Sequence, residues 1–582
     1  MMSPQNIKYA PYSPATGTPL FTDLPGDAHP RIFEIGLVLA GAVSAGAYTG
    51  GVLDFLFEAL DALADNRAND GRGLHEVRLK VITGASAGGM TAAITAAAAK
   101  RRFPHIRTDN DAASKGADNP FYNAWVLQID IRSLLDTADL AATKAAFGKP
   151  VLQSLLDCSV LDTIVTTTLG ARNNDSADPP DRPWLADRVH LCFTTTNLRG
   201  VTYAFPFSGS QGALYSMTRH NDVARFSLHV RGSSTPRPDE IDLSFVPAGT
   251  TDSDWSSMGQ AALATGAFPV ALRARAIKPI AELYAASWFN KQGTATLTSS
   301  VKSEFTTEGQ LIHLDDDTPS QPDLQYIAID GGMINNEPLE LARIELAGIL
   351  GHNPQTAQSA CRAVIMVDPF PATPDPGTLT GTGNETVWAV MGGMMTAFTN
   401  QNRFHPEDIR LALDESVYSR FMISPSGPNA KEGAQAIAGG ALHGFSGFLD
   451  KSYRHHDFML GRLNCYNFLK YYFTIPIPEP TDNSTPMPWL FSGEPRTLNE
   501  DLPPHLRTGP RHTAVPSSPC SARQRRNPHP RDGPSTHSIP TACAVPSAAG
   551  STRSSTPISR PWPPPRGASA WVWHGLRSFP AA

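Results

Sequence analysis

The stretch that decides the fold is VRLKVITGASAGGMTAAITAAAAK, residues 77–100. Its first half is rich in apolar residues, which predicts a buried strand over 77–83. Its second half is mostly alanine, which predicts a helix that reaches about Lys100. The residues between them, Gly84-Ala85-Ser86-Ala87-Gly88, are all small. A strand, a sharp turn and a helix in direct succession are typical of one unit of an α/β protein.

Two other segments repeat this order. Residues 32–39 (IFEIGLVL) form an apolar run, residues 41–51 are a loop with four glycines, and from Val52 the apolar residues follow helical spacing. Residues 324–346 (LQYIAIDGGMINNEPLELARIEL) again indicate a strand, a turn and a helix, and residues 361–371 indicate one more buried strand. The sequence therefore predicts an α/β fold with a mostly parallel central sheet and helices on both faces.

Composition suggests four parts in the chain of 582 residues. We expect an extended arm over 1–31, a core over 32–350, and a last core strand with a helical extension over 351–478. Residues 479–582 are rich in Pro, Ser and Arg and have no apolar periodicity, which is typical of disorder. Helices are expected at 125–136 and 151–169, and a helix that begins at Met258 is expected to be stopped by Pro269. Paired helices are expected at 441–473, and hairpins within 200–260.

The bulk properties exclude several classes of protein. A formal net charge of −6 gives no reason to expect nucleic acid as a partner. The six cysteines are far apart, and the chain has no CxxC, HExxH or EF-hand pattern, so neither a metal nor another cofactor is expected. With no signal-peptide pattern and no apolar span of sufficient length, we expect a cytoplasmic protein, with peripheral contact to a membrane as an option. The oligomeric state is left open.

Ser86 is the first candidate for chemistry. The pattern Gly-x-Ser-x-Gly places a serine on a strained turn above a sheet, and small flanking residues such as Gly84 and Gly88 allow that turn to close. The N–H groups at the start of the next helix can then face a developing negative charge. Taken alone, the pattern also fits a purely structural turn, but the predicted strand and helix on either side favour a nucleophile.

Two further loops follow predicted strands. The residues of the first, Gly41-Ala42-Val43-Ser44-Ala45-Gly46, can either aim unpaired N–H groups into a cleft or simply allow close packing. The second contains Asp330-Gly331-Gly332, where Asp330 is either a turn former or a reactive carboxylate. Small-residue loops at the ends of strands are expected to gather at one edge of an open α/β sheet.

The proton acceptor for Ser86 is a separate question. Five histidines could serve as the base of a Ser–His–Asp triad: His352, His405, His443, His455 and His456. None of them follows a predicted strand directly. Asp330 is better placed, because a carboxylate within hydrogen-bond reach can accept the serine proton.

Taken together, the three blocks resemble the patatin-like phospholipase family. LVLAGAVSAGAYTGGVLDFL resembles its glycine-rich block, GASAGG its nucleophile turn, DGGMINNEP its Asp-Gly-Gly/Ala block, and ATGAFPVAL a helix end that precedes it. The resemblance covers roughly residues 32–350, and GFLDKSYRHHDFMLGRLNCYNFL resembles an extension found in some bacterial members. It implies a Rossmann-like sandwich that hydrolyses acyl esters of phospholipids or neutral lipids, so the expected partner is a lipid ester at a lipid surface. It also implies a Ser–Asp dyad without histidine, with Ser86 as nucleophile, Asp330 as proton acceptor and oxyanion donors in the loop from Gly41 to Gly46.

The first block departs from the family pattern. Where the family commonly has Gly-Gly-Gly-x-Arg/Lys-Gly, Ala42 and Val43 replace the second and third glycines and Ala45 replaces the cation. A valine at a position that needs a positive φ would be strained, and the missing cation removes one contact to a phosphate. Two other functions are therefore considered beside a Ser–Asp hydrolase: a histidine-dependent α/β-hydrolase and a catalytically inactive lipid-binding protein.

Overall fold

The computed structural model describes residues 32–70, 76–170, 181–206, 214–244, 253–278, 325–347, 360–371 and 419–476, apart from 238 and 428–430, together with residue 353, parts of 385–397 and short strands at 310–311, 496–497 and 513–516. The chain divides into two units, Met1–Thr541 and Ala542–Ala582, and every described residue belongs to the first. The predicted arm over 1–31 lies outside the described residues, as does most of 479–582.

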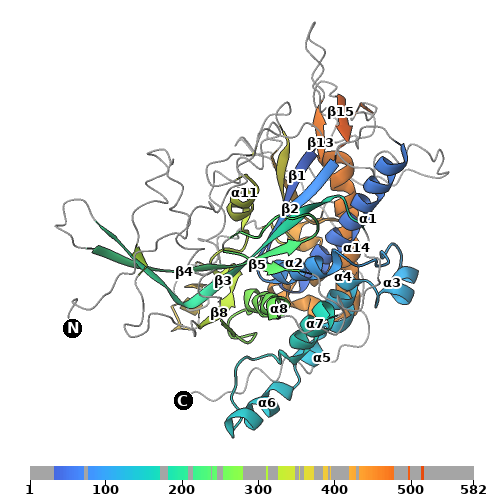
Figure 1. Cartoon of the computed structure of the whole chain (residues 1–582). Helices are drawn as coiled ribbons and strands as arrows, with labels where there is room; N and C mark the ends of the chain where they lie inside the picture. The colour runs from blue at the N-terminus through green and yellow to red at the C-terminus, as the bar shows by residue number, and fades with distance from the viewer. Residues whose placement is uncertain are drawn as a thin grey trace, which may run out of the picture. The chain divides into compact units, whose positions relative to one another are not determined.

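A mixed sheet is the centre of the fold (Figure 1). Its main path runs β10-β9-β1-β2-β3-β4-β5, and all neighbours from β10 to β3 are parallel. The strands of this path are β1 (Ile32–Leu39), β2 (Glu76–Gly84), β3 (Leu185–Pro206), β4 (Leu214–His229), β5 (Ile241–Leu243), β9 (Arg362–Val367) and β10 (Arg420–Ile423). The predicted fold class, a mostly parallel sheet in an α/β protein, is confirmed.

Alternation along the strands distributes apolar side chains to both faces. In β1, Phe33, Ile35, Leu37 and Leu39 point to the larger core, which also contains apolar residues of the helices α1 (Gly46–Asp70), α2 (Ala87–Ala98) and α14 (Lys451–Asn467). Val38 points the other way, into a smaller cluster with the helix α11 (Leu339–Ala347). This follows from the period of two in a strand. Helices therefore cover both faces, as the sequence predicts.

The remaining helices belong to the segments that connect the strands along the chain. They are α3 (Asp109–Lys115), α4 (Pro120–Tyr122), the π-helical segment η3 (Asn123–Gln128), α5 (Ile131–Leu134), α6 (Ala138–Phe147), α7 (Ser159–Gly170) and α8 (Ser253–Thr265). The last helix, α14, continues into the π-helical segment η11 (Phe468–Tyr472). Among the described residues, no helix is long and apolar enough to cross a membrane.

The strand that leads to Asp330 arrives from the opposite direction. This strand, β8 (Tyr326–Asp330), is antiparallel to β3 and to β6 (Arg275–Ile277), and Asp330 is paired with Thr195. Because β3 continues well beyond the ends of β1 and β2, β8 can pair with its far part and run back toward them. The three strand ends therefore meet, but β8 does so as an antiparallel strand and not as one more parallel neighbour. A short strand, β7 (Gln310–Leu311), also pairs with β3.

Helices α1 and α14 pack closely although they are far apart in the sequence (Figure 1). A Cβ added to Gly51 would overlap the backbone of Phe458, so the glycine permits the close crossing. Arg462 of α14 forms ion pairs with the buried Asp54 and with Glu58 of α1. Described residues of β9 and α14 are thus part of the main core, and β9 lies inside the sheet between β1 and β10. The expected boundaries at 31, 350 and 478 stay predictions.

Two predicted helices are interrupted by side-chain caps. Residues 125–136 do not form one helix, because Asp130 accepts the N–H of Arg132 and starts the separate helix α5. Residues 151–158 are not helical, because Asp157 accepts the N–H of Ser159 and α7 starts there. An aspartate is a favourable residue just before a helix, and its effect outweighs the apolar spacing around it.

The predicted pair of helices over 441–473 is also different. Only α14 is a long helix, and Asp450 caps it by accepting the N–H of Ser452. The residues before it form the 3₁₀ turns η9 (Ala438–Gly440) and η10 (Leu442–Phe448), and Gly444 has φ = +88°. Beyond α14, β13 (Thr474–Pro476) and β14 (Arg496–Thr497) each pair with β15 (Thr513–Pro516). We refer to residues 438–449 below as the covering segment.

Candidate active site

Ser86 occupies a strained turn at the end of β2. Its backbone has φ = 51° and ψ = −127°, in a region that non-glycine residues seldom adopt. Gly84 is the last residue of β2, and Gly88 lies in the first turn of α2. A Cβ on Gly88 would overlap the carbonyl oxygen of Leu39, which also accepts the N–H of Ala85 at 3.1 Å. The small residues of this serine turn (residues 84–88) thus allow it to pack directly on the end of β1.

Two side chains hold Ser86. Its Oγ donates to Oδ2 of Asp330 at 2.7 Å, and its N–H donates to Oγ1 of Thr265 at 2.9 Å. Ser86 is 8% exposed and Asp330 is 3% exposed. Two residues that are 244 positions apart in the sequence are therefore joined by a direct, buried hydrogen bond.

Asp330 is held both by its carboxylate and by its backbone. Oδ1 accepts the N–H of Gly332 at 2.7 Å, and its own N–H donates to the carbonyl of Ala267 at 2.9 Å. Gly331 and Gly332 form the start of a 3₁₀ turn, η6 (Gly331–Met333). Burial raises the pKa of Asp330 to about 6, although the hydrogen bonds from Ser86 and Gly332 act in the opposite direction. A carboxylate with this pKa is ionised near neutral pH and can accept a proton.

The loop of residues 41–46 lies beside the serine turn. A Cβ on Gly41 would overlap Oδ1 of Asn336 and come 3.0 Å from Cβ of Ser86. The N–H of Gly41 donates to the carbonyl of Asn336 at 3.2 Å, and the N–H of Gly46 bonds within the turn η2 (Val43–Ala45). Within the described part of the chain, the N–H groups of Ala42, Val43 and Ser44 have no acceptor. Those of Ala42 and Val43, the nearest to Gly41, are among the donors left for a ligand.

Val43 confirms the strain that the sequence indicated for this loop. Its φ is 49°, which is unfavourable for any L-residue and more so for a β-branched one. The covering segment supports it from outside. Ser44 Oγ donates to the carbonyl of Gly444, and a Cβ on Gly444 would come within 3.3 Å of Val43 Cβ. The loop therefore has a partner that lies 400 residues further along the chain.

The covering segment is itself anchored by two charged side chains of α14. Arg454 is 1% exposed and donates to the carbonyls of Gly447 and Phe448, at 2.8 and 3.2 Å, and to that of Val126 in η3. Asp457 accepts the N–H groups at the start of η9, at 2.7 and 2.9 Å. These contacts connect α14, through the covering segment, to the loop beside Ser86.

Three residues of the site have no role in the sequence reasoning above: Thr265, Asn336 and Gly444. Thr265 and Asn336 lie within ATGAFPVAL and DGGMINNEP, so their position beside known blocks is a usable signal. Gly444 carries no such signal, because its contact with Val43 follows only from the packing of α14.

The described histidines contact other groups. His455 bonds to the hydroxyl of Tyr122 and to Asp109, and His456 bonds to Asp457. His352 and His405 lie outside the described residues, as does the side chain of His443. Among the described residues, no histidine bonds to Ser86, and no group of three or more His, Cys, Asp or Glu side chains could hold a metal ion.

The fold and this arrangement define an α/β protein with a serine on a strained turn beside a buried carboxylate. The family model of patatin-like phospholipases matches residues 37–343, slightly more than half of the chain. The chain belongs to the patatin-like phospholipase family, as the sequence resemblance indicates. This family is one of lipid acyl hydrolases.

Two individual proteins are similar to this chain. An uncharacterised protein of Sinorhizobium fredii, y4iI, is 33% identical over 528 residues, which cover 85% of this chain and 71% of that protein. The crystal structure of VipD from Legionella pneumophila matches with 11% identity and a TM-score of 0.21, over 75% of this chain and 66% of that one.

Proposed function

We propose that the chain is a serine acyl hydrolase that cleaves carboxylic esters of lipids through a Ser–Asp dyad. The observation that carries this proposal is the hydrogen bond of 2.7 Å from Ser86 Oγ to Asp330 Oδ2, made on a strained turn at the start of a helix. A serine in hydrogen-bond contact with its base is the arrangement that nucleophilic catalysis requires.

In the proposed reaction, Ser86 Oγ attacks the ester carbonyl while Asp330 takes its proton. The free N–H groups of Ala42 and Val43, with the N-terminus of α2, stabilise the oxyanion. Asp330 then gives the proton to the departing alcohol, which leaves an acyl-enzyme. Water attacks the acyl-enzyme while Asp330 takes its proton. The bond to Ser86 Oγ then breaks, Asp330 returns the proton to Oγ, and the fatty acid is released. With alanine at position 45, the loop itself offers no cation to a phosphate, so the proposal covers lipid esters with and without a phosphate.

The direct test measures hydrolysis of dispersed phospholipid, triacylglycerol and lysolipid, and labelling by a fluorophosphonate probe. Replacing Ser86 with Ala is expected to lower turnover by about 10⁴-fold or more and to abolish labelling. Asp330→Asn should have a comparable effect on turnover. Ser114→Ala, at an exposed serine of α3, serves as the control. Unchanged turnover in Ser86→Ala contradicts the proposal, and absence of labelling in the unaltered chain favours an inactive lipid-binding protein.

We further propose that the site meets its substrate at a lipid surface. Phe268 directly follows Ala267, whose carbonyl accepts the N–H of Asp330. The ring of Phe268 contacts the ring of Phe445. Val270 is 73% exposed and accepts the N–H of Leu155, which is 65% exposed. These exposed apolar side chains suit insertion into lipid.

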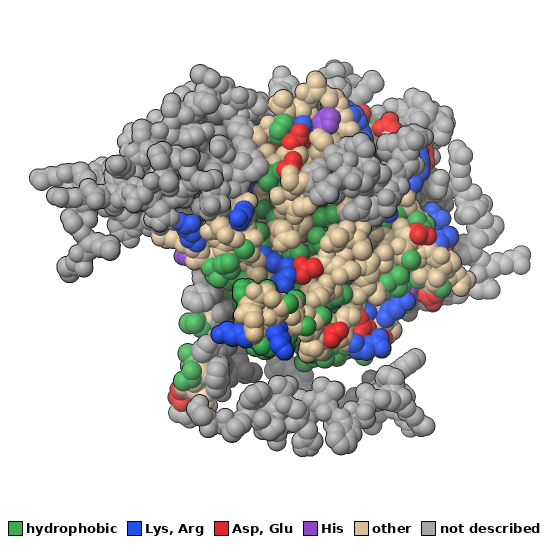
Figure 2. Space-filling model, turned by 60° about the horizontal axis from the view of Figure 1, so that its bottom comes forward, with side chains coloured by type: hydrophobic (Ala, Val, Ile, Leu, Met, Phe, Trp, Pro, Cys, Tyr) green, Lys and Arg blue, Asp and Glu red, His purple; other side chains and the backbone are tan. Residues whose placement is uncertain are grey.

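The described part of the face in Figure 2 shows hydrophobic side chains interspersed with side chains of both signs of charge. Flotation with phosphatidylcholine vesicles tests the contact. Val270→Asp should reduce the bound fraction, and equal flotation of Val270→Asp and the unaltered chain contradicts it.

A further inference from the structure

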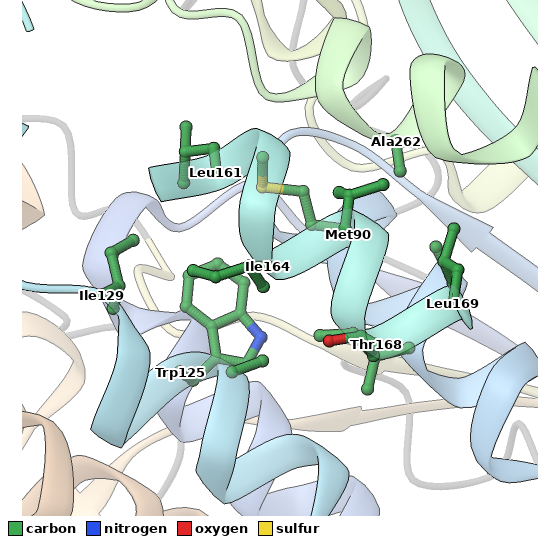
Figure 3. A pocket seen from close by; sticks show the side chains of 12 residues that line it. Met90, Trp125, Ile129, Leu161, Ile164, Thr168, Leu169 and Ala262 are labelled. Carbon is green, nitrogen blue, oxygen red and sulfur yellow. The ribbon is translucent and has the colours of Figure 1, made fainter. Parts of the chain in front are cut away.

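An apolar cavity lies between α2, η3, α7 and α8 (Figure 3). Of the twelve residues that line it, only Trp125 and Thr168 have polar side-chain atoms. The Nε1 of Trp125 already donates to Thr91 Oγ1 at 3.1 Å. The lining therefore suits hydrocarbon.

One end of the cavity is next to the dyad. Met90, which lines it, is the fourth residue after Ser86, and its N–H donates to the Ser86 carbonyl at 3.1 Å. Its side chain lies against Gly266, since a Cβ there would come within 2.8 Å of Met90 Cε. Gly266 stands between Thr265 and Ala267, whose oxygens bind the N–H groups of Ser86 and Asp330. The Met90 thioether is thus one layer away from the reacting groups.

The wall of the cavity also contacts the other half of the site. The ring of Trp125 packs on the first turn of α1, and a Cβ on Gly46 would overlap it. Gly46 is the last residue of the loop that offers the Ala42 and Val43 N–H groups. The cavity is therefore adjacent both to the nucleophile and to the loop that would hold the oxyanion.

We propose that this cavity binds the fatty acyl chain of the ester that Ser86 attacks, an inference that rests on the proposed function. No charged side chain lines the cavity, so a phosphate or polyol headgroup placed there would lose its hydration without gaining partners. A hydrocarbon chain has no such penalty. From Leu161 to Leu169 the α7 wall extends about 12 Å at 1.5 Å per residue, more than a butyryl group can fill. The preferred substrate is a long-chain ester.

Two neighbouring residues of α7 provide a matched test. Thr168 lines the cavity, whereas Thr167 is exposed on the outer side of the same helix. Thr168→Phe should lower kcat/KM for p-nitrophenyl palmitate about tenfold or more and leave p-nitrophenyl butyrate nearly unchanged. Thr167→Phe should change neither. Leu161→Ala, which enlarges the cavity, keeps the test informative if Thr168→Phe does not fold, because it should alter the palmitate-to-butyrate ratio in a folded protein.

A binding measurement separates this inference from the proposed function. In the Ser86→Ala background, the fluorescent fatty acid cis-parinaric acid should bind, Thr168→Phe should abolish binding, and Thr167→Phe should not. Equal losses on both esters, or parinaric acid binding that Thr168→Phe leaves intact, would overturn the acyl site while the hydrolase proposal stands. If the unaltered chain cleaves neither ester and no fluorophosphonate label is found, the proposed function fails, and the binding measurement alone decides what the cavity holds.

Discussion

The serine turn and the loop of residues 41–46 are both strained, but they are held in different ways. Ser86 has φ = 51° and Val43 has φ = 49°. The serine turn packs on the adjacent end of β1, through Gly88 and Ala85, and Thr265 holds the Ser86 N–H. The loop instead depends on Ser44 and on Gly444 of the covering segment.

The same strained conformation, with a positive φ, is therefore maintained in two different ways. Around Ser86, small residues remove the steric conflict locally, so the turn belongs to the strand–helix unit that contains it. At Val43, a β-branched residue keeps the conflict, and a distant segment maintains the conformation from outside. Strain of the second kind is expected to respond to changes far from the loop.

Among the changes that compare the two regions, Gly88→Ala is expected to have the largest effect. The added Cβ would overlap the Leu39 carbonyl, which cannot move freely because it accepts the Ala85 N–H. A displaced serine turn should lower kcat/KM for lipid esters by about 100-fold. Ala92→Gly, further along α2, is the control for general weakening of the helix. If Gly88→Ala retained full activity, local packing would not be what holds Ser86.

The pH profile should separate the two regions next. Asp330 must be ionised to accept the Ser86 proton, and burial raises its pKa to about 6. The value of kcat/KM should therefore be level above this pH and fall about tenfold per unit below it. Because the loop has no titratable side chain, Val43 variants should keep the same midpoint.

A histidine base could give a similar profile, so the five candidate histidines need single substitutions. Each variant should retain both turnover and the acid limb. Loss of turnover without unfolding in one of them would assign the proton to histidine and not to Asp330.

A smaller effect is expected from Gly444→Ala. Gly444 has φ = +88°, and its new Cβ would lie 3.3 Å from that of Val43. We expect kcat to fall about tenfold with little change in KM, because an oxyanion donor would move while the substrate site stays intact. Ala441→Gly, in the same segment, is the control. No change in kcat would show that the covering segment does not hold the loop.

The smallest effect is a gain of stability from Val43→Gly. Glycine adopts a positive φ without the steric penalty of valine, and the gain exceeds its entropy loss, so the free energy of unfolding should rise by about 0.5–1 kcal/mol. Urea denaturation measures this change, with Val43→Ala as an intermediate case. A decrease in stability would mean that the covering segment requires the valine side chain more than the loop resists it.

The sequence alone predicts the serine turn and the sheet around it, because strand, turn and helix are consecutive there. It also pairs Ser86 with Asp330. The direction of the strand that leads to Asp330 was not predicted, since β8 reaches the site as an antiparallel strand. The interrupted helices were missed because apolar spacing ignores the capping by Asp130 and Asp157.

The support of Val43 could not be predicted from the sequence. It depends on the packing of α14 against α1, where Gly51 meets Phe458 and Arg462 meets Asp54. Such contacts leave no local pattern, since each partner is an ordinary residue in its own segment.

The contact between Ser44 and Gly444 also sets an order of events during synthesis. The two residues are 400 positions apart, so at 5–20 residues per second roughly 20–80 s pass between their appearance on the ribosome. Ser86 and Asp330 are both made earlier. In the proposed enzyme, a nascent chain that already has its nucleophile and base still lacks the segment that holds Val43. For the proposed enzyme, we therefore expect full activity only after translation has passed the covering segment.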